Sequence, residues 1–351
     1  MIRLALVLFF FFSTLHVGAV ELLTVPFQRM PRSVKRMQFN SGGASTLWGP
    51  GQTSAVGASL LPLHGESERN HSLSGAHINF DDGNKHLFVG AYSTDLFPDV
   101  ALGIELSRLR SFSGPDTIDY NALYLGVSHL HSQGRDSYLY TGVTVSLHTV
   151  RDDLGIVAPH QNLSEDEKTD TYGEHLLTAD ISLMEFDLYN GANFALVLEN
   201  IVGYRWLENT VQRSSASKKR HSVGKWTGSQ LRSLLISGAN NIAIPHTESR
   251  LIIPMDVRFW GPLNRDLRER SKMRNRIEFF TGAELVRDSR LGLVFGYAWK
   301  NETVTTDPIH DIPHLRPEHS ISGGLSFYQS NISIHAALHD NHWGVELITG
   351  F

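Results

Sequence analysis

The 351-residue chain contains no cysteine, which excludes disulfide bonds, thiolate metal sites and a cysteine nucleophile. Its net charge is −5, so it lacks the basic excess that nucleic acid attracts, and we expect no nucleic-acid partner. It also lacks a Gly-x-Ser-x-Gly nucleophile elbow. After the first 19 residues, no stretch is long and apolar enough for a transmembrane helix. If the mature chain crosses a membrane, it must therefore do so with β-strands.

Residues 1–19 have the pattern of a secretory signal peptide. Arg3 supplies the positive start, residues 4–12 form an unbroken apolar run, and Val17-Gly18-Ala19 offers small residues for cleavage. The alternative is a membrane anchor, but the apolar run is too short to span a bilayer as a helix. We predict a signal peptide cleaved after Ala19, and therefore a mature chain that is either exported and soluble or a membrane barrel.

Residues 20–65 are poor candidates for strands, because four prolines interrupt them. Gly42, Gly43 and Ala44 form a small-residue stretch that could pack tightly inside a lumen, and Pro62 closes the segment. We predict a plug-like N-terminal segment that lies in the lumen or in the periplasm.

Alternation of apolar and polar residues dominates residues 66–351. In residues 138–151, Leu139, Val143 and Val145 fall on one face of an extended chain, and Tyr140 and Ser146 fall on the other. Similar segments cover residues 71–80, 86–96, 100–110, 120–132, 176–187, 194–206, 231–239, 242–245, 250–260, 276–287, 291–300, 320–328, 332–339 and 343–351. Segments of about ten residues match the length of a tilted transmembrane strand. We predict an all-β, antiparallel transmembrane barrel of about 12–14 strands.

The connections between these segments are of two kinds. Short turns alternate with long polar loops over residues 152–174, 208–230 and 301–317, an asymmetry typical of outer-membrane barrels. The alternative is an exported soluble β-sandwich, whose strands also alternate but bury one face against a second sheet. The barrel interpretation predicts the outer membrane of a Gram-negative cell, with outer-membrane lipid around the wall.

The last segment is expected to close the barrel. Trp343, Val345, Leu347 and Phe351 share one face, which suits an apolar outer wall with an aromatic residue at the membrane boundary. In outer-membrane families of this kind, a C-terminal strand that ends on an aromatic residue is what the barrel-assembly machinery recognises. That machinery is therefore an expected partner.

The chain contains 18 histidines, so metal sites must be considered. His310, His314 and His319 lie with two aspartates in a proline-rich loop over residues 307–319, and other histidines pair at 129/131 and group at 335–342. A zinc site needs convergent ligands with a supporting outer shell. None of these groups has a diagnostic spacing, so we predict no metal and no cofactor.

Catalysis by a lipid-modifying barrel would need a serine and a histidine near one another at the outer wall. Ser146 with His148, and Ser333 with His335, share strand faces. Period-2 placement produces such pairs by chance, and no further catalytic signature accompanies them. We therefore predict that the protein is not an enzyme. A Ser–His pair within hydrogen-bond reach on the outer wall would favour the enzymatic alternative.

Residues 178–203 carry a resemblance to a known family. An aspartate opens one strand, Asn190-Gly191 makes the turn, and a leucine-rich strand ends in Asn200-Ile201-Val202-Gly203. This hairpin resembles that of the PorV/UPF0164 group of outer-membrane barrels, which are similar to the FadL fatty-acid transporters. Gly42-Gly43-Ala44 also matches the group, whereas Ser59-Leu60-Leu61-Pro62 departs from the expected Asn-Pro-Ala of its luminal hatch. The resemblance implies passage of hydrophobic small molecules or docking of secreted proteins.

A second function class is a structural or adhesion barrel that binds partners through its long loops. An apolar luminal lining would favour transport, and a sealed lumen filled with side chains would favour the structural class.

Overall fold

The computed structural model describes Gln38 and residues 71–350, except for residues 81–84, 98, 114–115, 134–136, 153–167, 188–191, 214–215, 222–224, 227–232, 261–275, 289, 307–312, 330–331 and 341. The strands of the described part are β1 (His71–Phe80), β2 (Lys85–Phe97), β3 (Val100–Ser113), β4 (Asp116–Gln133), β5 (Ser137–Asp152), β6 (Lys168–Asp187), β7 (Ala192–Arg213), β8 (Ala216–His221), β9 (Lys225–Trp226), β10 (Ser233–Ala243), β11 (Ser249–Trp260), β12 (Arg276–Arg287), β13 (Leu291–Thr306), β14 (Pro313–Gln329), β15 (Ile332–His339) and β16 (His342–Gly350). Among the described residues, no helix is long and apolar enough to cross a membrane.

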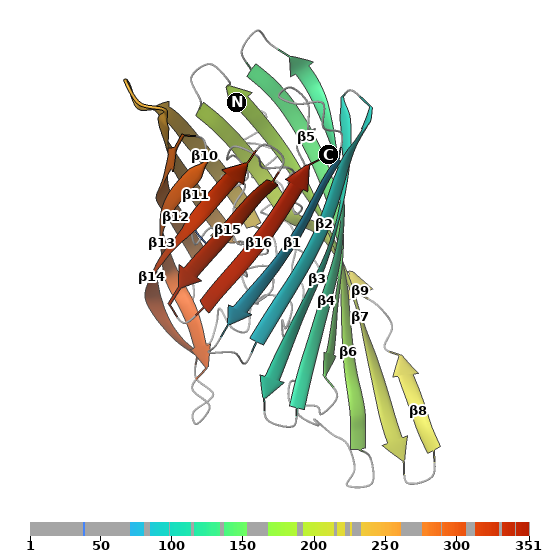
Figure 1. The fold of residues 1–351 in the computed structure, drawn as a ribbon. Helices are drawn as coiled ribbons and strands as arrows, with labels where there is room; N and C mark the ends of the chain where they lie inside the picture. Colours follow the sequence, from blue (N-terminus) through green and yellow to red (C-terminus); the bar gives the residue numbers. More distant parts are fainter. Residues whose placement is uncertain are drawn as a thin grey trace.

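The strands close into a barrel (Figure 1). Seven strands, β1 to β7, and seven more, β10 to β16, pair in sequence order, with β7 joined to β10 and β16 joined to β1. All of these pairings are antiparallel, so the ring contains fourteen strands and the predicted barrel is confirmed. The short strands β8 and β9 pair with β7 outside the ring. Closure leaves the ring without an unpaired edge, since each strand has a neighbour on both sides.

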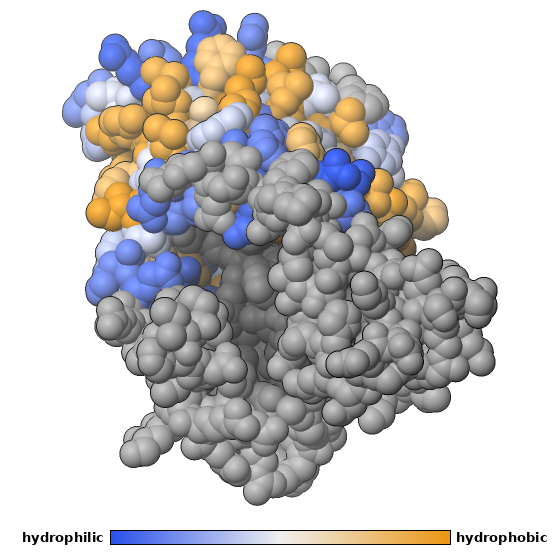
Figure 2. All heavy atoms as spheres, turned by 90° about the horizontal axis from the view of Figure 1, so that it is seen from below, coloured by the Kyte–Doolittle hydropathy of each residue, from blue (hydrophilic) through white to orange (hydrophobic). Residues whose placement is uncertain are grey.

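Burial shows which face of the wall is outside. On β3, Leu106 is 60% exposed, while its neighbours Glu105 and Ser107 are 4% and 5% exposed. Every strand of the ring carries at least one exposed large apolar side chain on its outer face. In the end-on view of Figure 2, apolar residues lie along the outer edge of the described wall. A β-sandwich would bury these apolar faces against a second sheet, so that alternative is wrong.

One pair of predicted strands is a single strand. Residues 231–239 and 242–245 were expected to be separate, but β10 runs without a break from Ser233 to Ala243. The chain then turns, with the Thr247 amide donating to the Ile244 carbonyl at 3.2 Å and His246 at a φ of 63°. Pro245 has no amide hydrogen to give to a ladder, which is why this stretch makes a hairpin turn instead of a strand.

The three predicted long loops are shorter than expected. The first loop is shortened because β6 already begins at Lys168, and the second because β7 continues to Arg213 and is followed by β8. The third is shortened because β13 ends only at Thr306 and β14 already begins at Pro313. Polar residues dominate these extensions, but ladder hydrogen bonds come from the backbone and do not require apolar side chains. The asymmetry remains, because every connection at the upper end of Figure 1 has two to five residues, whereas all the longer ones lie at the lower end, together with the short turns at 81–84, 114–115 and 340–341.

β6 and β7 bend where they leave the ring. A single residue of β6, Asp180, lies opposite residues 199–201 of β7, so the ladder contains a bulge. The Asn200 amide donates to Asp180 Oδ1 at 2.7 Å, and Asn200 has a φ of 54°, a conformation that asparagine tolerates better than most residues. Beyond the bulge, β6, β7 and β8 project from the long-loop end (Figure 1).

Candidate functional site

The lumen has an apolar wall on β1 to β4. Ile78 pairs across the sheet with Leu87, and Ala76 pairs with Val89, and all four side chains are buried on the inner face. The cluster that they belong to contains Ala76, Ile78, Phe80, Leu87, Val89, Ala91, Leu109, Tyr120, Ala122, Tyr124 and Ala337. Inner faces of membrane barrels are usually polar. An apolar inner wall is therefore a specific property of this lumen.

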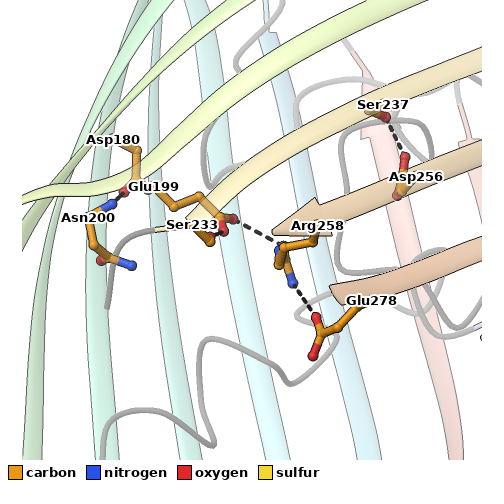
Figure 3. A network of polar contacts seen from close by, with 8 residues as sticks. All are labelled: Asp180, Glu199, Asn200, Ser233, Ser237, Asp256, Arg258 and Glu278. Carbon is orange, nitrogen blue, oxygen red and sulfur yellow. Dashed lines mark hydrogen bonds and ion pairs between the residues drawn. The ribbon is translucent and has the colours of Figure 1, made fainter. Parts of the chain in front are cut away.

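The opposite side of the ring carries charged groups (Figure 3). Arg258, which is 1% exposed, points from β11 between two carboxylates. Its Nη2 lies 3.1 Å from Glu199 Oε1 on β7, and its Nη1 lies 3.7 Å from Glu278 Oε2 on β12. The Ser233 hydroxyl of β10 donates to the other oxygen of Glu199. Four neighbouring strands are thus tied together through one guanidinium group.

This charged region is predominantly acidic. The buried side chains of the described residues include one lysine or arginine, Arg258, and six carboxylates. These carboxylates are Glu105, Asp180, Asp256, Glu278, Glu284 and Glu346. Several have hydroxyl partners, such as Ser237 for Asp256 and Tyr328 for Glu284. Four of the six, Asp180, Asp256, Glu278 and Glu284, lie on β6, β11 and β12 and form an acidic wall opposite the apolar cluster, whereas Glu105 lies on β3 and Glu346 on β16, beside that cluster.

Gln38 lies against the inner wall of β14 and β15, and we call its contacts there the seat of Gln38. It is 0% exposed. Its Nε2 donates to the carbonyl oxygens of Leu325 at 2.8 Å and Ala336 at 3.0 Å. Its own backbone carbonyl accepts from Ser322 Oγ at 2.7 Å, and its Oε1 accepts from Ser326 Oγ at 3.2 Å. These four hydrogen bonds hold Gln38 against the inner wall.

The seat depends on a glycine. A Cβ built on Gly324 would lie 2.9 Å from Gln38 Cγ and 2.2 Å from the Ala336 carbonyl oxygen. His335 supports the seat from β15, with its Nδ1 3.0 Å from Ser326 Oγ. Gln38 was not among the predicted site residues, although Gly323-Gly324 inside a strand is a recognised sign of close backbone approach.

Replacing Gly324 with alanine is expected to lower the free energy of unfolding by about 1–3 kcal/mol, because the new Cβ overpacks the seat. The measurement is urea unfolding of the folded barrel in detergent. Gly75→Ala is the matched control, since a Cβ built on Gly75 has no atom within 4 Å. Equal free energies of unfolding of Gly324→Ala and Gly75→Ala would contradict the close contact between Gln38 and Gly324.

Ser146 and His148 do meet, but on the inner wall. His148 Nε2 lies 3.0 Å from Ser146 Oγ, His148 Nδ1 contacts the Tyr120 hydroxyl, and Ser146 Oγ lies 2.6 Å from Thr178 Oγ1. Both Ser146 and His148 are 2% exposed. The enzymatic alternative requires such a pair on the outer wall, and this pair is buried within a chain of hydroxyl groups on the lumen side. At the second pair, His335 Nδ1 contacts Ser326.

The structure describes some of the other predicted site residues and not others. Trp343, Val345 and Leu347 are 43%, 47% and 49% exposed on the outer face of β16, whereas Phe351 lies outside the described residues. Gly42, Gly43, Ala44 and Pro62 lie outside them too, as does His310. His319 contacts the Tyr297 hydroxyl on β13 at 2.7 Å. Within the described ranges, no group of three or more histidines and carboxylates could hold a metal ion.

Comparison with solved structures finds other barrels. The toluene transporter TodX of P. putida superposes with a TM-score of 0.47 at 9% identity, over 82% of this chain and 91% of that chain. The CymD monoaromatic hydrocarbon channel gives 0.45 at 11% identity, over 81% and 87%. The translocator domain of the autotransporter NalP from Neisseria meningitidis gives 0.40 at 9% identity, over 83% and 91%.

No protein-family model matches the sequence, and no curated protein matches it significantly. At such low identities and scores, these neighbours carry no argument about function. The barrel architecture stands on the strand pairing of this chain itself.

Proposed function

We propose that this chain is an outer-membrane barrel of a Gram-negative cell that passes hydrophobic small molecules, without enzymatic activity or a cofactor. In this proposal, residues 1–19 direct export and are removed, and the barrel-assembly machinery inserts the chain by its last strand. The apolar exterior of a closed antiparallel ring supports the membrane position, because lipid requires apolar side chains outside and a fully paired backbone. The hairpin at residues 178–203 supports a PorV-type relationship.

The apolar inner wall is the observation that favours hydrophobic small molecules as the cargo. A water-filled channel gains nothing from placing Ile78, Leu87 and Val89 inside, since apolar surface disfavours water. A hydrophobic molecule that enters the lumen can contact this wall and leave water at the same time. Transport of hydrophobic small molecules is therefore the function that the lumen supports best.

The N-terminal segment, residues 20–65, is proposed to act as a luminal plug. The seat of Gln38 on β14 and β15 supports this role. Charge supports it as well, because Arg29, Arg32, Lys35 and Arg36 precede Gln38 in the sequence and the buried charged side chains of the described residues are mainly carboxylates. Opposite charges favour retention of a basic segment in an acidic lumen.

Transport can be measured with liposomes that contain the barrel and a fluorescent fatty-acid analogue. We expect Leu87→Asn/Val89→Asn to reduce uptake by about tenfold, because unpaired polar groups in an apolar path cost about 1–3 kcal/mol. Ser93→Asn is the control, since Ser93 lies on the same inner face of β2 and is already polar. Equal uptake by the wild-type protein, Leu87→Asn/Val89→Asn and Ser93→Asn would contradict the proposal. Wild-type uptake no greater than that of protein-free liposomes would contradict it as well.

A second candidate is docking of secreted proteins, or adhesion, at the long-loop end. The projection of β6, β7 and β8 beyond the ring favours it, because these paired strands extend the sheet past the end of the barrel. If the long-loop end docks a protein partner, deletion of residues 208–226 should abolish binding of that partner. The same deletion should leave uptake of the fatty-acid analogue unchanged.

A further inference from the structure

A basic and aromatic patch lies on the outer wall at the long-loop end, across β16, β1, β2, β3 and β4. Its members share the outward face and adjoin one another through the strand register. The patch consists of Trp343, His77, His86, Phe88, Arg108, Arg110, Asp119 and Asn121. We call it the boundary patch.

The aromatic half of the boundary patch is a stack. The His77 ring lies parallel to Phe88 with 4.7 Å between centroids and parallel to His86 at 5.5 Å. The Trp343 ring meets His77 edge-on at 5.3 Å. Phe88 is 52% exposed and Trp343 is 43% exposed, so the stack presents ring surface to its surroundings. Aromatic faces of this kind pack well against the apolar C–H surface of sugar rings.

The charged half adjoins the stack. Arg108 Nη2 and Arg110 Nε each lie 3.2 Å from one oxygen of Asp119. Two guanidinium groups against one carboxylate give this trio a net positive charge. Both arginine side chains remain about half exposed, at 53% and 43%. Cross-strand register places Arg108 beside Phe88 and Arg110 beside His86, so that the two halves form one surface.

The position of the boundary patch relative to the apolar band indicates what it meets. Leu106, two residues before Arg108 on the same face, is 60% exposed, and Ile104 continues the apolar face toward the short-turn end. Arginines immediately beyond an apolar band lie at the level of lipid headgroups. Next to the stack on its short-turn side, Gly75 and Gly90 pair across β1 and β2, and a Cβ built on either meets no atom within 4 Å. The wall is therefore hollowed where an acyl chain would descend.

We propose that the boundary patch binds one phosphorylated glycolipid of the leaflet on the long-loop side. Guanidinium groups bind phosphate oxygens in paired geometry, and the rings of Phe88 and Trp343 suit a sugar. The patch spans five strands, or about 19 Å at the usual strand spacing, which is wide for a phosphoglycerol headgroup and suits a phosphorylated disaccharide. This proposal rests on the membrane position proposed above.

The test uses native mass spectrometry of the folded, purified barrel titrated with lipid A, a phosphorylated diglucosamine lipid. We expect Arg108→Gln/Arg110→Gln to weaken binding at least about tenfold, because charge-assisted bonds to the phosphate are lost. Removal of the phosphates from lipid A should weaken binding to the wild-type protein to the same extent. The control is Arg287→Gln/Arg290→Gln, which removes two exposed arginines at the short-turn end and should leave affinity within about twofold.

Three results would overturn the glycolipid site. The first is unchanged affinity of Arg108→Gln/Arg110→Gln when heat-dependent gel mobility shows a folded barrel. The second is equal binding of phosphatidylglycerol, and the third is equal weakening by the control variant. Failure of the wild-type barrel to insert into bilayers would overturn the membrane position itself, and the glycolipid site with it.

Discussion

Arg258→Ala will lower the free energy of unfolding by about 3–5 kcal/mol, because it leaves buried carboxylates without their cation. Arg258 is 1% exposed and lies between Glu199 and Glu278, which come from strands on either side of β10 and β11. Loss of the guanidinium group removes both attractions and brings two negative charges into one uncompensated region. The measurement is urea unfolding of the barrel in detergent micelles, followed by tryptophan fluorescence.

Two further variants show whether charge is the cause. Arg287→Ala removes an arginine whose side chain is 77% exposed beside Asp288, and should change stability by less than about 0.5 kcal/mol. Glu278→Gln added to Arg258→Ala removes one of the uncompensated charges and should restore part of the loss. A loss below about 1 kcal/mol for Arg258→Ala would show that the acidic wall does not depend on this ion network.

Gln38→Cys/Ser322→Cys will form a disulfide that stops passage through the lumen. The chain has no cysteine of its own, so a new disulfide can form only between the two introduced residues. The Ser322 hydroxyl lies 2.7 Å from the Gln38 carbonyl oxygen, which places the two residues side by side. In the oxidised protein, we expect uptake of the fluorescent fatty-acid analogue to fall to that of protein-free liposomes and to recover after reduction.

The control pair is Gln38→Cys/Ser237→Cys. Ser237 lies on β10, four strands from β14 around the ring, or about 19 Å at the usual spacing, so no disulfide should form. If mass spectrometry finds the Gln38–Ser322 disulfide and uptake is unchanged, the N-terminal segment does not control passage. If the disulfide does not form in the folded barrel, the predicted cross-link at this position is wrong.

The extent to which the sequence predicted the fold can be followed in single strands. The alternation in residues 138–151 predicted β5 almost in full, because an outer face in lipid and an inner polar face force a period of two. The ends of β6, β7, β13 and β14 were missed, because strands that continue beyond the membrane are polar on both faces and look like loops. The predicted break between residues 231–239 and 242–245 was wrong, because Asn240 and Asn241 resemble turn residues but continue the ladder of β10 with β11.

The site was less predictable than the fold. Ser146 and His148 were recognised as sharing a face, but only the closed ring shows that this face is inside and that Tyr120 and Thr178 complete the contacts. Gln38 has no distinctive local pattern, and its partners lie more than 280 residues away, at Leu325 and Ala336. The Arg258 network joins β7, β11 and β12 in the same way, through contacts between strands that periodicity does not order.

The sequence by itself determined that this protein is built of alternating antiparallel strands and predicted a barrel, because alternation and short turns are local properties of the chain; the exclusion of a β-sandwich needed the burial of each face. It also placed the apolar face of β16, with Trp343, Val345 and Leu347 in alternate positions. Only the tertiary structure decided the ring of fourteen strands, the apolar cluster and the Arg258 network inside it, the seat of Gln38 and the boundary patch. These features depend on which strands become neighbours when β1 meets β16, and that closure is a non-local event.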